Sequence, residues 1–124
     1  MAINQRRPIK KETGATYNKD RKKRKAELGR PASLTKVGES KVKKIRTVGG
    51  NFKLRALQSS KIIVMDGKKK VAANILRVVE NASNRHYTRM NVMTKGAIIE
   101  TDKGKVKITS RPGQTGQIQG ILVK

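Results

Sequence analysis

The chain has 124 residues, and 31 lysines and arginines against 8 acidic residues give it a formal net charge of +23. A compact domain with this charge repels itself, so a polyanionic partner is expected, and nucleic acid is favoured because each neutralised phosphate also releases counterions. The absence of cysteine excludes disulfides, cysteine-ligated zinc and a thiol nucleophile.

An anionic membrane surface is the competing partner for so basic a chain. It requires an amphipathic helix with large apolar side chains on one face, but the chain has no tryptophan and one phenylalanine. The opening "MAINQRRPIK" lacks the apolar segment of a secretory signal, and the longest apolar run, 62–65, is far too short to span a bilayer. We therefore expect neither a secretory signal nor membrane contact.

Residues 1–41 are predicted to form a basic arm. Within it, "DRKKRKAELG" predicts a short helix near 20–28, because Asp20 can cap its start, Gly29 can end it and Pro31 opposes its continuation. Cations lie on every side of this helix and no apolar stripe is present, so the missing stabiliser should be an anion. A solvated surface or a nuclear-import signal is the alternative interpretation.

We predict that the basic and aromatic side chains of the arm contact nucleic acid, either RNA or DNA. These candidates are Arg6, Arg7, Lys10, Lys11, Tyr17, Arg21, Lys22, Lys23, Arg24, Lys25 and Arg30.

Residues 42–124 are predicted to form a small β domain, a sandwich or a barrel, because short apolar segments alternate with turn signals. In "KVKITS" the alternation places Val106 and Ile108 inward. Pro112 and Gly113 are expected at the centre of a type II turn. Three strand pairs are expected around turns at 49–51, 66–67 and 102–104.

The segment "NRHYTRMN", residues 84–91, lacks a strand period and is expected to form a loop or one helical turn. Arg85 and Arg89 could bind phosphates through their planar, bidentate donors, and His86 or Tyr87 could stack on a base. The alternative is that Tyr87 closes the barrel end and His86 bonds a turn. We add Arg46, Lys95 and Arg111 to the candidates for nucleic-acid binding.

Nothing in the sequence favours catalysis. His86 is the single histidine, no phosphate-binding loop motif occurs, and the acidic residues are scattered. Glu100 and Asp102 would share one strand face, which is typical of a solvated strand end and not of opposed catalytic carboxylates. We expect no enzyme activity, no cofactor and no metal site.

Four segments resemble a known family. "TGATYNKDRKKRKAELGRP", "IRTVGGNFKLRAL", "NRHYTRMNVMTKGAIIET" and "ITSRPGQTG", in this order, are similar to the family of small-subunit ribosomal protein eight of the archaeal and eukaryotic type. The similarity runs through nearly the whole chain, and the short length resembles the archaeal form.

The resemblance implies a mostly β fold, with a small β-barrel body at 42–124 and a basic amino-terminal arm lying along ribosomal RNA. It implies a structural role in the small ribosomal subunit, where the protein would stabilise folded ribosomal RNA through phosphate and shape contacts. The implied partners are small-subunit ribosomal RNA and neighbouring ribosomal proteins, and we expect no homo-oligomer. The alternatives are a ribosome-assembly factor resembling the same family and a DNA-compacting basic protein.

Overall fold

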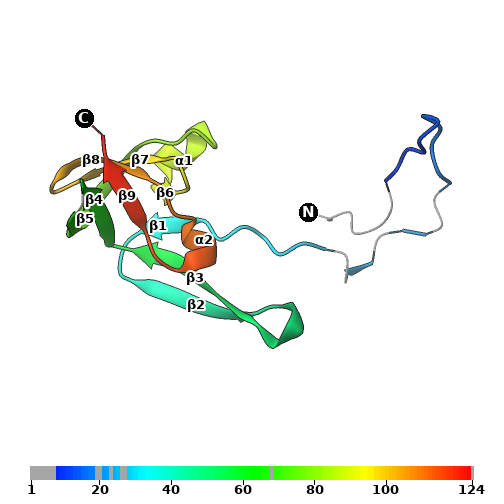
Figure 1. The fold of residues 1–124 in the computed structure, drawn as a ribbon, viewed down its shortest axis with the longest axis horizontal. Coiled ribbons are helices and arrows are strands. Elements are labelled where there is room, and N and C mark those ends of the chain that lie inside the picture. The colour runs from blue at the N-terminus through cyan, green and yellow to red at the C-terminus, as the bar shows by residue number, and fades with distance from the viewer. Residues whose placement is uncertain (1–7, 19–20, 23, 26–27, 68, 124) are drawn as a thin grey trace. The chain divides into compact units, whose positions relative to one another are not determined.

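The computed structural model describes residues 8–18, 21–22, 24–25, 28–67 and 69–123. The chain divides into two compact units, Met1–Ala32 and Ser33–Lys124 (Figure 1). Unit 2, the second of these, contains all the strands and helices described below. Its elements are β1 (Thr35–Val37), β2 (Lys41–Arg46), the 3-10 turn η2 (Val48–Gly50), β3 (Phe52–Ser59), β4 (Lys61–Asp66), β5 (Lys69–Glu80), α1 (Arg85–Arg89), β6 (Val92–Met93), β7 (Ile98–Thr101), β8 (Gly104–Ile108), α2 (Pro112–Thr115) and β9 (Gln119–Leu122).

Part of the predicted arm lies outside the described residues. This holds for Arg6, Arg7 and Lys23, and for Asp20, Ala26 and Glu27 of the segment expected to be helical. The four described basic residues of that segment belong to no α-helix; they are Arg21, Lys22, Arg24 and Lys25. A short segment with like charges three and four apart is a poor helix on its own. The helix near 20–28 therefore stays a prediction for the RNA-bound chain.

The described start of the first unit contains a small hairpin-like loop. Lys10 and Thr16 form an isolated antiparallel bridge. The Lys11 amide donates to the Ala15 carbonyl at 2.7 Å, and the Tyr17 amide donates to the Ile9 carbonyl at 3.0 Å. The loop is a local structure that the charge pattern of this segment did not indicate.

Unit 2 is built around a closed five-stranded barrel of β4, β5, β7, β8 and β9. Neighbouring strands run antiparallel around the barrel, except for β4 and β9, which close it as a parallel pair. The strand pairs expected around 66–67 and 102–104 are β4–β5 and β7–β8. The predicted mostly β fold with a small barrel is confirmed.

The barrel interior is small and aliphatic. Val106 and Ile108 are buried, as the alternation in β8 predicts, while the alternate residues Lys105 and Lys107 are exposed. Burying such a side chain stabilises the fold by about 1.5–3 kcal/mol. The core comprises Ile62, Val64, Ala73, Ile75, Val78, Met93, Ala97, Ile99, Val106, Ile108 and Ile118.

Gly120 on β9 allows close packing inside the barrel. A Cβ at this position would lie 2.5 Å from Val106 Cγ1 and 2.7 Å from the Lys107 carbonyl oxygen. Gly120 is paired with Ile108 across the β8–β9 ladder. Because backbone and core side chains both occupy the space, any larger residue here must displace part of the barrel.

A second sheet in unit 2 has the strand order β2-β3-β1-β6. β1 pairs in parallel with β3 and antiparallel with β6. The division expected from sequence at residue 41/42 falls inside unit 2, since β1 precedes it. The sequence analysis did not identify β1 or β6, which have only three and two residues and form through pairing with strands distant in sequence.

The prediction of a type II turn centred on Pro112 and Gly113 is wrong. Residues 112–115 form the short helix α2, with Pro112 in its first turn and Gly116 at its end in the left-handed conformation, φ 74°. Proline suits the first helical turn because its missing amide hydrogen has no partner there, and glycine suits the left-handed end. The sequence "RPGQTG" therefore carried the signals of a short helix as well as those of a turn.

Candidate nucleic-acid interface

Tyr17 and Lys11 form one candidate group in the first unit. The Tyr17 ring is half-buried, and Lys11 Nζ lies 5.3 Å from its centroid. A cation at this distance attracts the ring face electrostatically. Lys10, Lys11, Arg21, Lys22, Arg24, Lys25 and Arg30 are all exposed.

Helix α1 carries the second group of candidates. Asn84 precedes it with extended backbone, and its Oδ1 accepts a hydrogen bond from the His86 amide at 2.9 Å, which fixes the start of the helix. Arg85 and Arg89, four residues apart, lie on the same side of this single turn. Both arginines and His86 are exposed, whereas Tyr87 is half-buried. Of the two forms expected for this segment, a loop or one helical turn, the structure has the helical turn.

The His86 ring lies beside an arginine. Arg85 Nε donates to His86 Nε2 at 3.4 Å, a long hydrogen bond that leaves most of the guanidinium donors available. The alternative interpretation was that His86 bonds a turn. Its backbone amide bonds Asn84, but its ring lies at the surface.

Lys95 lies in a turn that is tied to the loop before α1. Thr94 Oγ1 donates to Asn81 Oδ1 at 2.9 Å and lies 3.3 Å from Ser83 Oγ. Asn81 Nδ2 also donates to the Val92 carbonyl at 3.0 Å. These bonds hold the 81–84 loop against the Thr94–Lys95 turn, so the exposed Lys95 belongs to the same region as α1. We call Arg85, His86, Arg89 and Lys95 the α1 cluster.

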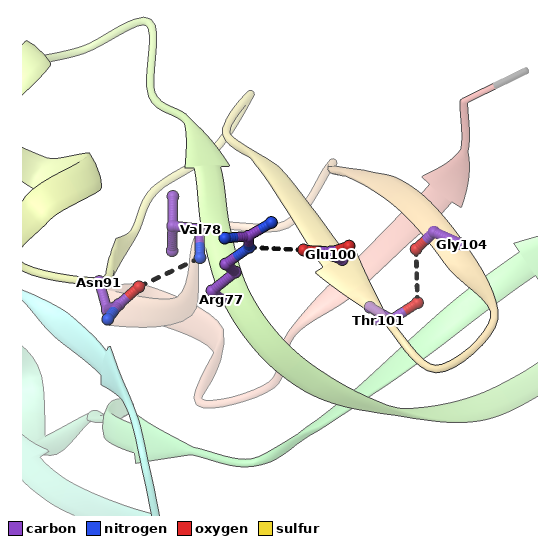
Figure 2. Close-up of polar contacts among 6 residues, drawn as sticks. All are labelled: Arg77, Val78, Asn91, Glu100, Thr101 and Gly104. Atoms are coloured by element: carbon purple, nitrogen blue, oxygen red, sulfur yellow. Dashed lines mark hydrogen bonds and ion pairs between the residues drawn. The ribbon is translucent and has the colours of Figure 1, made fainter.

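Asn91 fastens the other end of α1 to the sheets. Its Oδ1 accepts a hydrogen bond from the Val78 amide on β5 at 3.2 Å (Figure 2), and its carbonyl accepts one from the Val37 amide on β1 at 3.3 Å. Asn91 has φ 51°, a left-handed conformation that asparagine tolerates better than most residues. The end of α1 is therefore bonded to β5 of the barrel and to β1 of the second sheet, and the loop before α1 is bonded to the Thr94–Lys95 turn.

The two carboxylates considered as a catalytic pair have structural partners instead. Glu100 Oε2 forms an ion pair with Arg77 Nε at 2.6 Å, across the β5–β7 ladder (Figure 2). Asp102 accepts hydrogen bonds from the backbone amide and the side chain of Asn74, at 3.1 and 3.3 Å. Beside them, Thr101 Oγ1 donates to the Gly104 carbonyl at 2.8 Å and closes the β7–β8 turn.

Arg46 and Arg111 lie apart from the α1 cluster in the fold. Arg46 is exposed at the end of β2, and Arg111 is exposed immediately before α2, where its carbonyl accepts hydrogen bonds from Gln114 and Thr115. The structure thus joins four of the predicted residues into the α1 cluster and leaves these two at separate positions.

The sequence analysis missed a further group of cations on the β2–β3 hairpin. Lys43 pairs directly with Arg55, and Lys53 is the next same-face residue on β3. We call Lys43, Lys53 and Arg55 the cationic face. Its signal was present in the sequence: alternation along two strands joined at 49–51 places these positions on one side, once the register is known.

Two negative findings apply to the part of the chain that the structure describes. No group of three or more histidine, cysteine or acidic residues there could hold a metal ion. Of the helices it contains, none has the length and apolar character needed to cross a membrane.

Comparison with known proteins matches this chain over almost its full length. The family model for ribosomal protein S8e matches residues 4–123. A protein of Nanoarchaeum equitans named "Small ribosomal subunit protein eS8" is 52% identical over 114 residues, covering 90% of each chain. The protein of the same name from Methanobrevibacter smithii is 48% identical, covering 99% of this chain and 100% of its own. A third, from Haloarcula marismortui, is 42% identical and covers 97% and 98%. The chain belongs to the ribosomal protein S8e family.

Proposed function

We propose that this protein is a structural component of the small ribosomal subunit that binds and stabilises folded ribosomal RNA, with neighbouring ribosomal proteins as its other partners. Membership of a ribosomal protein family supports a structural role and not a catalytic one. The role places the protein in the ribosome, in the cytoplasm.

The observation that carries the RNA-binding part of the proposal is the α1 cluster. Arg85, His86 and Arg89 are exposed on a helical turn that is bonded at both ends, with Lys95 in the adjoining turn. The backbone that carries these arginines need not be ordered on binding, and arginine geometry suits bidentate contact with phosphate oxygens. The basic arm adds charge, since residues 1–30 contain 11 basic and 3 acidic residues.

Most of these contacts would be to phosphates and sugars and would read the shape of the RNA. Lysine and arginine contacts to the backbone position a protein but carry little sequence information. Among the residues predicted from sequence, the side chains suited to base stacking are fewer, namely Tyr17, His86 and Tyr87, and stacking contributes about 1–3 kcal/mol per base where it occurs. Specificity would come from the folded geometry of the RNA.

The test is co-sedimentation with ribosomal subunits. The tagged protein, expressed in its source organism, is expected to sediment with mature small subunits. Sedimentation only with immature particles would favour the assembly-factor alternative. Equal affinity of the purified protein for duplex DNA and for small-subunit ribosomal RNA would favour a DNA-compacting protein.

A further inference from the structure

The β2–β3 hairpin is the most basic regular element of unit 2. Its strands contain six lysines and arginines, and no acidic residue occurs from 40 to 65. Figure 1 shows the outer end of the hairpin reaching beyond the rest of unit 2. In the described chain, β3 between Phe52 and Leu57 has β2 as its only strand partner, since β1 pairs with Gln58 and Ser59.

This outer part of the hairpin has an unfavourable distribution of charge. Lys43 lies directly opposite Arg55, and like charges in that arrangement destabilise a strand pair. Lys53 adds a third positive charge diagonally across from Lys43. Among the described residues, no carboxylate forms an ion pair with Lys43, Lys53 or Arg55. The ion pair found among those residues joins Arg77 and Glu100. A two-stranded ribbon is in any case only marginally stable in water.

The need to protect a sheet edge from pairing with other chains does not account for the uniformly positive charge of the β2–β3 hairpin. Charged side chains on edge strands prevent unwanted pairing with other chains, but either sign of charge serves that purpose. Here every charge on both strands is positive. The arrangement is therefore suited to an anionic partner that would offset the repulsion.

The opposite side and the tip of the hairpin expose apolar groups. Val48, in the turn, is 95% exposed, and Phe52 is 56% exposed. Phe52 pairs with Arg46, and Lys44 Nζ lies 4.1 Å from its ring centroid. Nearer the barrel the end of α2 lies against this side, because a Cβ on Gly116 would lie 2.7 Å from Leu54 Cβ and 3.5 Å from Val42 Cγ1, but Leu54 and Val42 stay about half exposed.

We infer that the β2–β3 hairpin is a separate RNA-binding finger, with the cationic face on the phosphate backbone and Val48 and Phe52 against unstacked bases. The inference rests on the proposed function and assigns it a second site on unit 2, distinct from the α1 cluster. Single-stranded and irregular RNA offers both chemistries, since it presents phosphates beside bases that stack on aromatic rings.

The first test compares two variants of equal charge. One replaces the cationic face (Lys43→Gln, Lys53→Gln, Arg55→Gln), and its control replaces three exposed lysines of the β7–β8 hairpin (Lys103→Gln, Lys105→Gln, Lys107→Gln). Both full-length proteins are titrated with small-subunit ribosomal RNA transcribed from the source organism. We expect the cationic-face variant to lose about tenfold more affinity than the control, with an unchanged or higher melting temperature when free. Equal losses of RNA affinity in the two variants would overturn the proposed RNA-binding finger.

The second test locates the tip on RNA. Because the chain has no cysteine, Val48→Cys provides a unique thiol for an iron chelate that generates hydroxyl radicals, and Lys103→Cys is the matched control. Strong cuts confined to a short stretch of the RNA are expected from position 48. If the cuts from position 48 are no stronger than those from the control, the tip does not lie on RNA and the inference is wrong.

The two proposals can fail separately. If the unmodified protein binds ribosomal RNA tightly but both hairpin tests are negative, the finger is wrong and the proposed function stands. If the unmodified protein does not prefer ribosomal RNA to duplex DNA, both are wrong.

Discussion

Single side chains decide the stability of the barrel because its core is small. Ile108 is buried with 1% of its surface exposed, among aliphatic neighbours that have no bulky aromatic residue to fill a gap. Replacing Ile108 with alanine is expected to lower the free energy of unfolding by about 2–5 kcal/mol. Chemical denaturation checks this value. A loss below about 1 kcal/mol would show that the side chain does not support the core.

At Gly120 we expect the barrel to be destabilised by added side-chain volume, whereas at Ile108 it is destabilised by lost volume. Gly120→Ala places a methyl group against Val106 and the Lys107 carbonyl, and overpacking of this kind costs about 1–3 kcal/mol. A matched variant is Gly67→Ala, at a turn where a Cβ meets no atom within 4 Å, although its φ of 57° adds some backbone strain. Thermal melts should therefore fall for both variants, and a larger fall for Gly67→Ala would contradict the packing argument.

Among the elements, α1 connects a local structure to the proposed RNA contact. Replacing Arg85 and Arg89 with glutamine removes two exposed cations and leaves the Asn84 cap in place. We expect affinity for small-subunit ribosomal RNA to fall about tenfold or more, equivalent to about 1.4 kcal/mol, and the salt slope to fall by about 2. Titration at several salt concentrations measures both. The control is Lys105→Gln with Lys107→Gln, and equal effects of the two variants would argue against α1.

The basic segment of the arm is the second element to test. Replacing Arg21, Lys22, Arg24 and Lys25 with glutamine removes four cations but keeps good helix formers. The melting temperature of the free protein should stay unchanged, because unit 2 has its own core, and RNA affinity should fall with a shallower salt slope. A melting temperature several degrees lower without RNA would show that this segment supports the folded body.

An element could be predicted from sequence when the residues that determine it lie close together along the chain. The hairpins at 66–67 and 102–104 were predicted because alternation and turn residues lie together in sequence, and the β4–β5 and β7–β8 pairs confirm them. β1 and β6 could not be predicted, since strands of three and two residues exist only through distant partners. The cationic face was missed for a different reason: the strand pair around 49–51 was predicted and is β2–β3, but its exact register, which brings the three charges together, was not.

At the scale of the whole molecule, the net charge indicates the kind of partner, and the barrel organises the fold of unit 2. The net charge of +23 indicates a polyanion but does not distinguish ribosomal RNA from DNA. The resemblance of four segments to a ribosomal family made that distinction, and the family match over residues 4–123 confirms it. Which side chains contact RNA stays a prediction, because exposure and charge identify many candidates of equal chemistry.

The most direct measurement is the affinity of the full-length protein for small-subunit ribosomal RNA as a function of salt concentration. If the arm, the α1 cluster and the hairpin together neutralise about 6–10 phosphates, raising salt from about 50 to 200 mM should weaken binding by about 10³–10⁵, on the scale known for duplex DNA. A logarithmic plot of affinity against salt should be linear and steep. A nearly flat plot would contradict the account, because binding would then owe little to phosphate neutralisation.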